Sequence, residues 1–142
     1  MPQKNEPNSK AASKFILIGE DDIDDQDLLK EVFASVDDSF RLLFANTGEQ
    51  TLSALKKLHE GQLPCLILLD YNMPGLNGAD ILKELNQETR YAGIPRIIWS
   101  TSNSNIFKNV CLELGATDYL IKPSSLKEMT GIIQYMLSIC VA

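Results

Sequence analysis

The 142-residue chain is poor in basic residues and lacks long apolar runs, and each shortage excludes a class of function. Its 13 Lys and Arg stand against 19 Asp and Glu, for a net charge of −6. Because binding to a nucleic-acid backbone requires a basic surface, we expect no contact with DNA or RNA. No apolar run has the length of a membrane-spanning helix, and residues 1–13 lack the apolar core of a signal peptide. We therefore expect a cytoplasmic protein with no membrane partner.

Cysteine and histidine are also scarce. Cys65, Cys111 and Cys140 are odd in number, widely spaced and without a C-x-x-C pair. This spacing argues against a disulfide framework and against a zinc site, and it favours a reducing compartment. His59 is the only histidine, and we expect it in solvent on the polar side of a helix. The length predicts one domain, residues 14–142, after a flexible tail formed by residues 1–13.

Five short apolar runs alternate with segments of helical spacing. The runs are Phe15–Gly19, Arg41–Ala45, Cys65–Leu69, Arg96–Trp99 and Asp118–Ile121. Each connection is long enough for the helical crossover that joins parallel strands, and continuously apolar strands are typical of a sheet covered on both faces. The pattern predicts an α/β fold, a (βα)5 doubly wound domain with a parallel five-stranded sheet.

The connecting segments carry apolar stripes that we expect to face the core. The stripes are Leu28, Leu29, Val32, Phe33 and Val36; Leu52, Leu55 and Leu58; Ile81, Leu82 and Leu85; Ile106, Val110 and Leu114; and Leu126, Met129, Ile132, Ile133 and Met136. Each stripe recurs at the three- and four-residue spacing of one helix face. We interpret these stripes as core rather than as cofactor sites.

Polar side chains follow four of the five strands. Glu20 and Asp21 follow the first strand, Asp70 the third, Ser100 the fourth and Lys122 the fifth. The carboxyl ends of parallel strands share one edge of a sheet, and neighbouring strands lie about 4.8 Å apart. We therefore expect these side chains to meet at one site.

The acids of this edge predict a cation site. Carboxylates so close together repel one another, and the cluster survives only with raised pKa values or a counter-cation. Glu20, Asp21 and Asp70, with the backbone carbonyl of Asn72, suit Mg²⁺, which accepts a few carboxylates and retains several waters.

The remaining two groups predict the reaction. The ammonium of Lys122 and the hydroxyl of Ser100 would bind a tetrahedral anion, so a phosphoryl group fits between them and the acids. Asp70 is then the candidate nucleophile, because carboxylates form aspartyl phosphates and phosphoryl transfer requires mainly positioning and charge neutralisation.

This set of residues resembles the receiver domain of two-component response regulators. The matching segments are Glu20-Asp21, Asp70-x-Asn72-Met73-Pro74-Gly75, Ser100 and Tyr119-x-x-Lys122-Pro123. The resemblance covers roughly residues 14–140 and implies the flavodoxin-like strand order 2-1-3-4-5, counted along the chain. It implies that Asp70 accepts a phosphoryl group from a histidine kinase or a His-containing phosphotransfer protein. The state of the domain would then pass to an unknown downstream protein, as in a chemotaxis-type single-domain regulator.

The resemblance also assigns roles to single residues. Lys122 would contact the phosphoryl oxygens, and Ser100 would bond to them. Tyr119 matches the switch aromatic, which turns inward as the Ser100 hydroxyl moves. The bond between Lys122 and Pro123 is usually cis in the family. Trp99 is unusual at its position, and we expect it in the core, where it would alter the packing under the following helix.

Several alternatives remain beside this interpretation. Asp22, Asp24 and Asp25 are expected to form a solvated acidic helix start rather than part of the site. A phosphorylation-independent receiver-like adaptor would use the fold without the chemistry. An aspartyl-phosphate phosphatase would need an acid where this chain has Asn72, and a flavodoxin-like binder would need a phosphate loop where it has Glu20. About twenty residues follow Lys122, so we expect no appended output domain.

Overall fold

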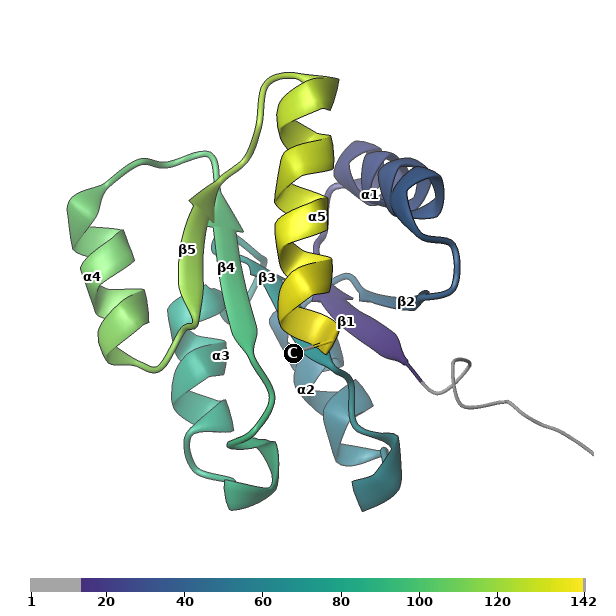
Figure 1. Cartoon of the computed structure of the whole chain (residues 1–142). Coiled ribbons are helices and arrows are strands. Elements are labelled where there is room, and N and C mark those ends of the chain that lie inside the picture. Colours follow the sequence, from purple (N-terminus) through teal and green to yellow (C-terminus); the bar gives the residue numbers. More distant parts are fainter. Residues whose placement is uncertain (1–13, 142) are drawn as a thin grey trace, which may run out of the picture.

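Within residues 14–141, which the computed structural model describes, five parallel strands form one sheet in the order β2-β1-β3-β4-β5 (Figure 1). The strands are β1 (Phe15–Gly19), β2 (Arg41–Ala45), β3 (Leu66–Asp70), β4 (Arg96–Ser100) and β5 (Asp118–Ile121). The helices are α1 (Ile23–Val36), α2 (Gly48–Lys56), α3 (Gly78–Leu85), α4 (Asn105–Glu113) and α5 (Leu126–Val141). The predicted fold class and strand order are confirmed. The expected tail, residues 1–13, lies outside the described residues.

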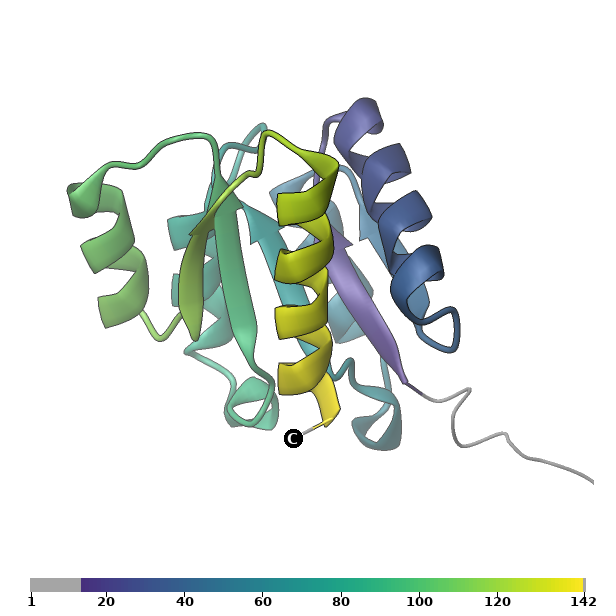
Figure 2. The same cartoon turned by 45° about the horizontal axis from the view of Figure 1, so that its top comes forward.

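Two apolar clusters cover opposite faces of the sheet, because successive residues of a strand point to opposite sides. One cluster joins strand residues such as Leu17, Leu69 and Ile98 to α2, α3 and α4. The other joins residues such as Ile18 and Leu68 to α1 and α5. Figure 2 shows α1 and α5 side by side on one face of the sheet. Burial on both sides explains the continuous apolar runs of β1, β3 and β4, whereas the edge strands β2 and β5 are partly exposed.

Side-chain caps begin helices that follow the strands of the sheet. Asp22 accepts a hydrogen bond from the Asp25 backbone N–H at the start of α1. Asn77 and Asp80 form a reciprocal capping box at α3. Ser104 caps α4 by accepting from the backbone N–H of Phe107. Each cap fixes where a helix begins after the loop at the carboxyl edge of the sheet.

Helix α4 packs against the core with a different face from the one predicted. Ile106 is 73% exposed and Val110 38% exposed, so their assignment to the core is wrong. Leu114, the third residue of the predicted stripe, does pack against the core. Cys111 is buried and Phe107 partly buried in the places expected for Ile106 and Val110. Apolar residues occur on both sides of this nine-residue helix, so periodicity alone did not identify its inner face. In α5, Leu126 is likewise exposed, at 60%.

Cys65 and Cys140 form a disulfide, so the expectation of no disulfide is wrong. Helix α5 runs back along the sheet and ends beside the start of β3, where the two Cα atoms lie 5.1 Å apart. The two cysteines are 75 residues apart, so rules based on short cysteine spacings did not predict this bond. Cys111 is free and buried, and its burial raises the pKa of the thiol to about 11.

Two further expectations concern the position of His59 and the presence of membrane-spanning helices. His59 is exposed as expected, but it follows α2, which ends at Lys56, and precedes a short 3-10 turn. In the described part of the chain, no helix combines the length and the apolar character needed to cross a membrane.

Replacing Cys140 by Ser should lower the free energy of unfolding by about 2–4 kcal/mol, because a bond across 75 residues restricts the unfolded chain. Denaturant titrations with and without reductant measure this difference. Reductant should destabilise the Cys111→Ser variant as much as the unchanged protein, and it should leave Cys140→Ser unaffected. If unfolding the non-reduced protein exposed free thiols from Cys65 and Cys140 as well as Cys111, the disulfide would be disproved.

Candidate functional site

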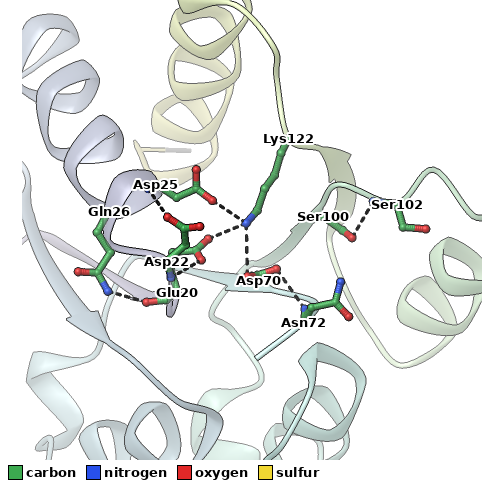
Figure 3. A network of polar contacts seen from close by, with 9 residues as sticks. All are labelled: Glu20, Asp22, Asp25, Gln26, Asp70, Asn72, Ser100, Ser102 and Lys122. Carbon is green, nitrogen blue, oxygen red and sulfur yellow. Dashed lines mark hydrogen bonds and ion pairs between the residues drawn. The ribbon is translucent and has the colours of Figure 1, made fainter. Parts of the chain in front are cut away.

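Three acids from two strand ends and one helix surround the ammonium of Lys122 at the carboxyl edge of the sheet (Figure 3). Its Nζ lies 3.0 Å from Glu20 Oε1 and 3.3 Å from Asp70 Oδ2. A third carboxylate oxygen, Oδ2 of Asp25, lies 2.9 Å away. Glu20 is fully buried and Asp70 is 5% exposed, so these charges interact in a region that contains little water.

Backbone pairing holds these groups in place. Glu20 continues β1 by donating its N–H to the carbonyl of Ala45. Lys122 likewise extends β5 by donating to the carbonyl of Ser100. Because β1 and β3 are neighbours, residues that leave their carboxyl ends reach a common point. The predicted convergence is therefore a consequence of the strand order.

Glu20, Asp21 and Asp70 each offer a carboxylate oxygen, and these oxygens lie within 4.8 Å of one another. Asp21 is exposed while the other two are buried, so the group opens to solvent on one side. The backbone N–H of Asn72 donates to Asp70 Oδ1 over 3.1 Å, which orients the carboxylate. Three oxygen donors with an open side fit a hard divalent cation that retains water.

The pKa values of Glu20 and Asp70 are raised, and burial is the main cause for both. Burial raises the pKa of Glu20 to about 7, and the charge of Asp70 adds to the rise, against opposing hydrogen bonds from the Asp22 N–H and Lys122. Burial also raises the pKa of Asp70, although Lys122 opposes it. Burial alone would lower the pKa of Lys122. Its hydrogen bonds to Asp25 and Glu20 outweigh this effect, so the pKa is raised above its ordinary value. The lysine is therefore charged, and its ammonium offsets part of the negative charge of the acids.

Ser100 and Tyr119 lie on the β4–β5 side of the site. Ser100 is fully buried, and its Oγ accepts a hydrogen bond from the backbone N–H of Ser102 over 3.0 Å. Figure 3 shows Ser100 on the other side of Lys122 from Glu20. Tyr119 is 5% exposed, and its hydroxyl donates to the carbonyl of Ser102 over 2.8 Å. Ser102 thus connects both residues to the loop before α4.

The expectation that Asp25 is merely solvated is wrong, since it contacts Lys122. Asp22 caps α1 as expected, and Asp24 is exposed. Asp21 precedes α1, which begins at Ile23, so the sequence did not show that Asp25 in the first turn would face the strand ends. Gln26 was also missed: its side chain donates to the carbonyl of Glu20 over 2.6 Å and thereby fixes this loop.

Two further predictions about single residues are corrected. Trp99 is in the core, at 1% exposure, but it packs with α1 and α5 and not under α4. The reason is strand alternation, which directs Trp99 and Ser100 to opposite sides of the sheet. No peptide bond in the described residues is cis, so the expected cis bond between Lys122 and Pro123 is wrong. In the trans form Lys122 still reaches the acids.

Comparison with known proteins agrees with this geometry. A family model for the response regulator receiver domain matches residues 16–134. Transcriptional regulatory protein CpxR of Klebsiella pneumoniae is 38% identical over 122 residues, which cover 86% of this chain and 48% of that protein. Two-component response regulator ORR5 of Oryza sativa is 32% identical over 105 residues, covering 71% of this chain and 75% of that protein.

A solved structure, the Mn²⁺-bound form of response regulator Rcp1, is similar to this fold with a TM-score of 0.75 and 30% identity. The similarity covers 88% of this chain and 92% of that one. The chain spans about half the length of CpxR, so its relation to the whole of that relative is limited to the shared domain. The match over residues 16–134 shows that this chain belongs to the response regulator receiver domain family, whose members are signalling domains of two-component systems.

Proposed function

We propose that this receiver, in the domain we place at residues 14–142, is a switch controlled by phosphorylation of Asp70. The observation that supports it is the position of the Asp70 carboxylate, 3.3 Å from the Lys122 ammonium and within the acidic group that could hold a cation. A carboxylate oxygen of Asp70 would attack the phosphorus of a phosphohistidine. The new O–P bond replaces the P–N bond, and the donor imidazole leaves.

Each residue of the site has a part in this transfer. Glu20, Asp21, Asp70 and the Asn72 carbonyl would hold Mg²⁺, which would offset charge on the phosphoryl oxygens. Lys122 would contact the same oxygens and offset the charge that develops on them. The donor would be a histidine kinase or a His-containing phosphotransfer protein. We expect the domain to assist its own phosphorylation and dephosphorylation without being a classical enzyme.

The output would begin at Ser100. A phosphoryl group on Asp70 offers strong acceptor oxygens to the Ser100 hydroxyl, which in turn contacts Ser102. Tyr119 holds the same residue, so movement of the hydroxyl would reach the loop before α4. An exposed apolar face beyond this loop, which includes Ile106 and Ile121, would then bind the downstream protein.

The other functions and the location have less support. The Asn72 side chain cannot act as the acid and base of a phosphatase, and the close contacts at Asp70 do not favour a phosphorylation-independent adaptor.

A cytoplasmic location remains part of this proposal and rests on sequence composition. The disulfide between Cys65 and Cys140 does not support a reducing compartment.

With Mg²⁺ and a small phosphodonor, the protein should gain one phosphoryl group, and Asp70→Asn should gain none. The amide lacks the nucleophilic oxygen that forms the O–P bond. Intact mass spectrometry measures the change. Asp27→Asn alters an exposed acid on the same helix as Asp25 and should be phosphorylated at the unchanged rate. Incorporation into Asp70→Asn, or none into the unchanged protein, would refute the proposal.

The affinity for Mg²⁺ should rise about tenfold between roughly pH 6 and pH 8, since Glu20 has a pKa of about 7 and must be deprotonated to bind a cation. Below its pKa the folded protein holds a proton that the metal must displace, and above it the affinity should level off. The fluorescence of Trp99, the only tryptophan, can follow the titration. Glu20→Gln should bind more weakly and show a flatter pH dependence. An equal affinity at both pH values would contradict the assignment.

A further inference from the structure

Lys122 has two partners outside the acidic group that could hold a cation. Asp25 Oδ2 lies 2.9 Å from its ammonium. The ammonium also lies over the indole ring of Trp99, with Nζ 4.9 Å from the ring centroid. Neither residue belongs to the group formed by Glu20, Asp21 and Asp70.

The Trp99 ring is a fixed surface. It is 1% exposed and packs in one cluster with Met129 and Ile133 of α5. The side chain of Lys122 is itself only 13% exposed. A cation over an indole face is attracted by the negative face of the ring, and the attraction grows when water is excluded. The ring can therefore hold the ammonium without carrying a charge of its own.

We propose that Asp25 and Trp99 are positioning residues, which keep the Lys122 ammonium beside Asp70 when a divalent cation binds there. This inference rests on the proposed phosphoryl transfer. In the structure Glu20 and Asp70 lie within 3.3 Å of the ammonium. A divalent cation on these acids would neutralise much of their charge and would also repel the ammonium.

The attraction of the other two partners persists under those conditions. Asp25 projects from α1 on the side of the ammonium away from Asp70, as Figure 3 shows. The indole carries no net charge, so a metal ion does not draw it away. Lys122 thus retains a carboxylate and an aromatic face, and its long side chain is already ordered when phosphoryl oxygens arrive. The rate of phosphorylation should depend on Asp25 and Trp99.

The first test measures phosphorylation of the full chain by phosphoramidate in saturating Mg²⁺. Asp25→Asn and Trp99→Leu should each slow the rate about fivefold, and Trp99→Phe, which keeps a smaller ring, should slow it about twofold. Asp24→Asn removes the same charge from the same turn of α1, at an exposed position that makes no ion pair with Lys122, and should match the unchanged protein. If Trp99→Leu fails to fold by circular dichroism, Asp25→Asn and Trp99→Phe decide.

The second test needs no phosphorylation. The ε-methylene protons of Lys122, assigned by their loss in Lys122→Met, should be shifted upfield in the NMR spectrum by the Trp99 ring. The shift should persist when Mg²⁺ is added and should disappear in Trp99→Leu.

The outcomes separate this inference from the function on which it rests. Normal phosphorylation with unchanged rates in Asp25→Asn and Trp99→Phe would overturn the positioning role and leave the switch intact. Loss of the upfield shift on adding Mg²⁺ would overturn it as well. A persistent shift in a protein that takes no phosphoryl group would confirm the held lysine and refute phosphorylation of Asp70.

Discussion

The carboxyl edge of this sheet depends on the contact between one ammonium and the buried acids around it. Lys122 lies within 3.3 Å of both Glu20 and Asp70, and burial disfavours the charged form of each acid. The ammonium lowers the pKa values of Glu20 and Asp70, but burial outweighs it and both stay raised. A divalent cation would relieve this imbalance, and a phosphoryl group would then bring negative charge to a site already rich in cations.

The strand order makes this contact possible. Central strands β1 and β3 are neighbours, so Glu20 and Asp70 leave the sheet side by side. Asp70 in turn is paired in register with Trp99 of β4. Lys122 arrives from β5 across the end of β4, to which its backbone is hydrogen-bonded through Ser100. The residues of the site are far apart in the sequence, and parallel pairing assembles the ones at the strand ends, while Asp25 joins them from α1.

Much of this was readable from the sequence, because parallel strands buried on both faces appear as apolar runs and their polar ends mark one edge. Asp70 and Lys122 were found in this way. Contacts that depend on the rotation of a helix or on the direction of a side chain were not found from the sequence. The contact of Asp25 with Lys122 depends on how α1 is rotated about its axis. The contact of Trp99 depends on the face of β4 from which its side chain projects. The Cys65–Cys140 bond depends on where α5 ends, which no local pattern encodes.

Helices α4 and α5 are attached to the site differently. Helix α5 is held at both ends: Lys122 precedes its start, and Cys140 near its end is bonded to Cys65 beside β3. In α4 only Cys111 is buried. Its ties to the site are the stack of Phe107 on Tyr71, 4.7 Å between centroids, and the loop residue Ser102 that Tyr119 holds. Because Tyr71 directly follows Asp70, this stack connects α4 to the end of β3, whereas a covalent bond fixes α5 beside the start of the same strand.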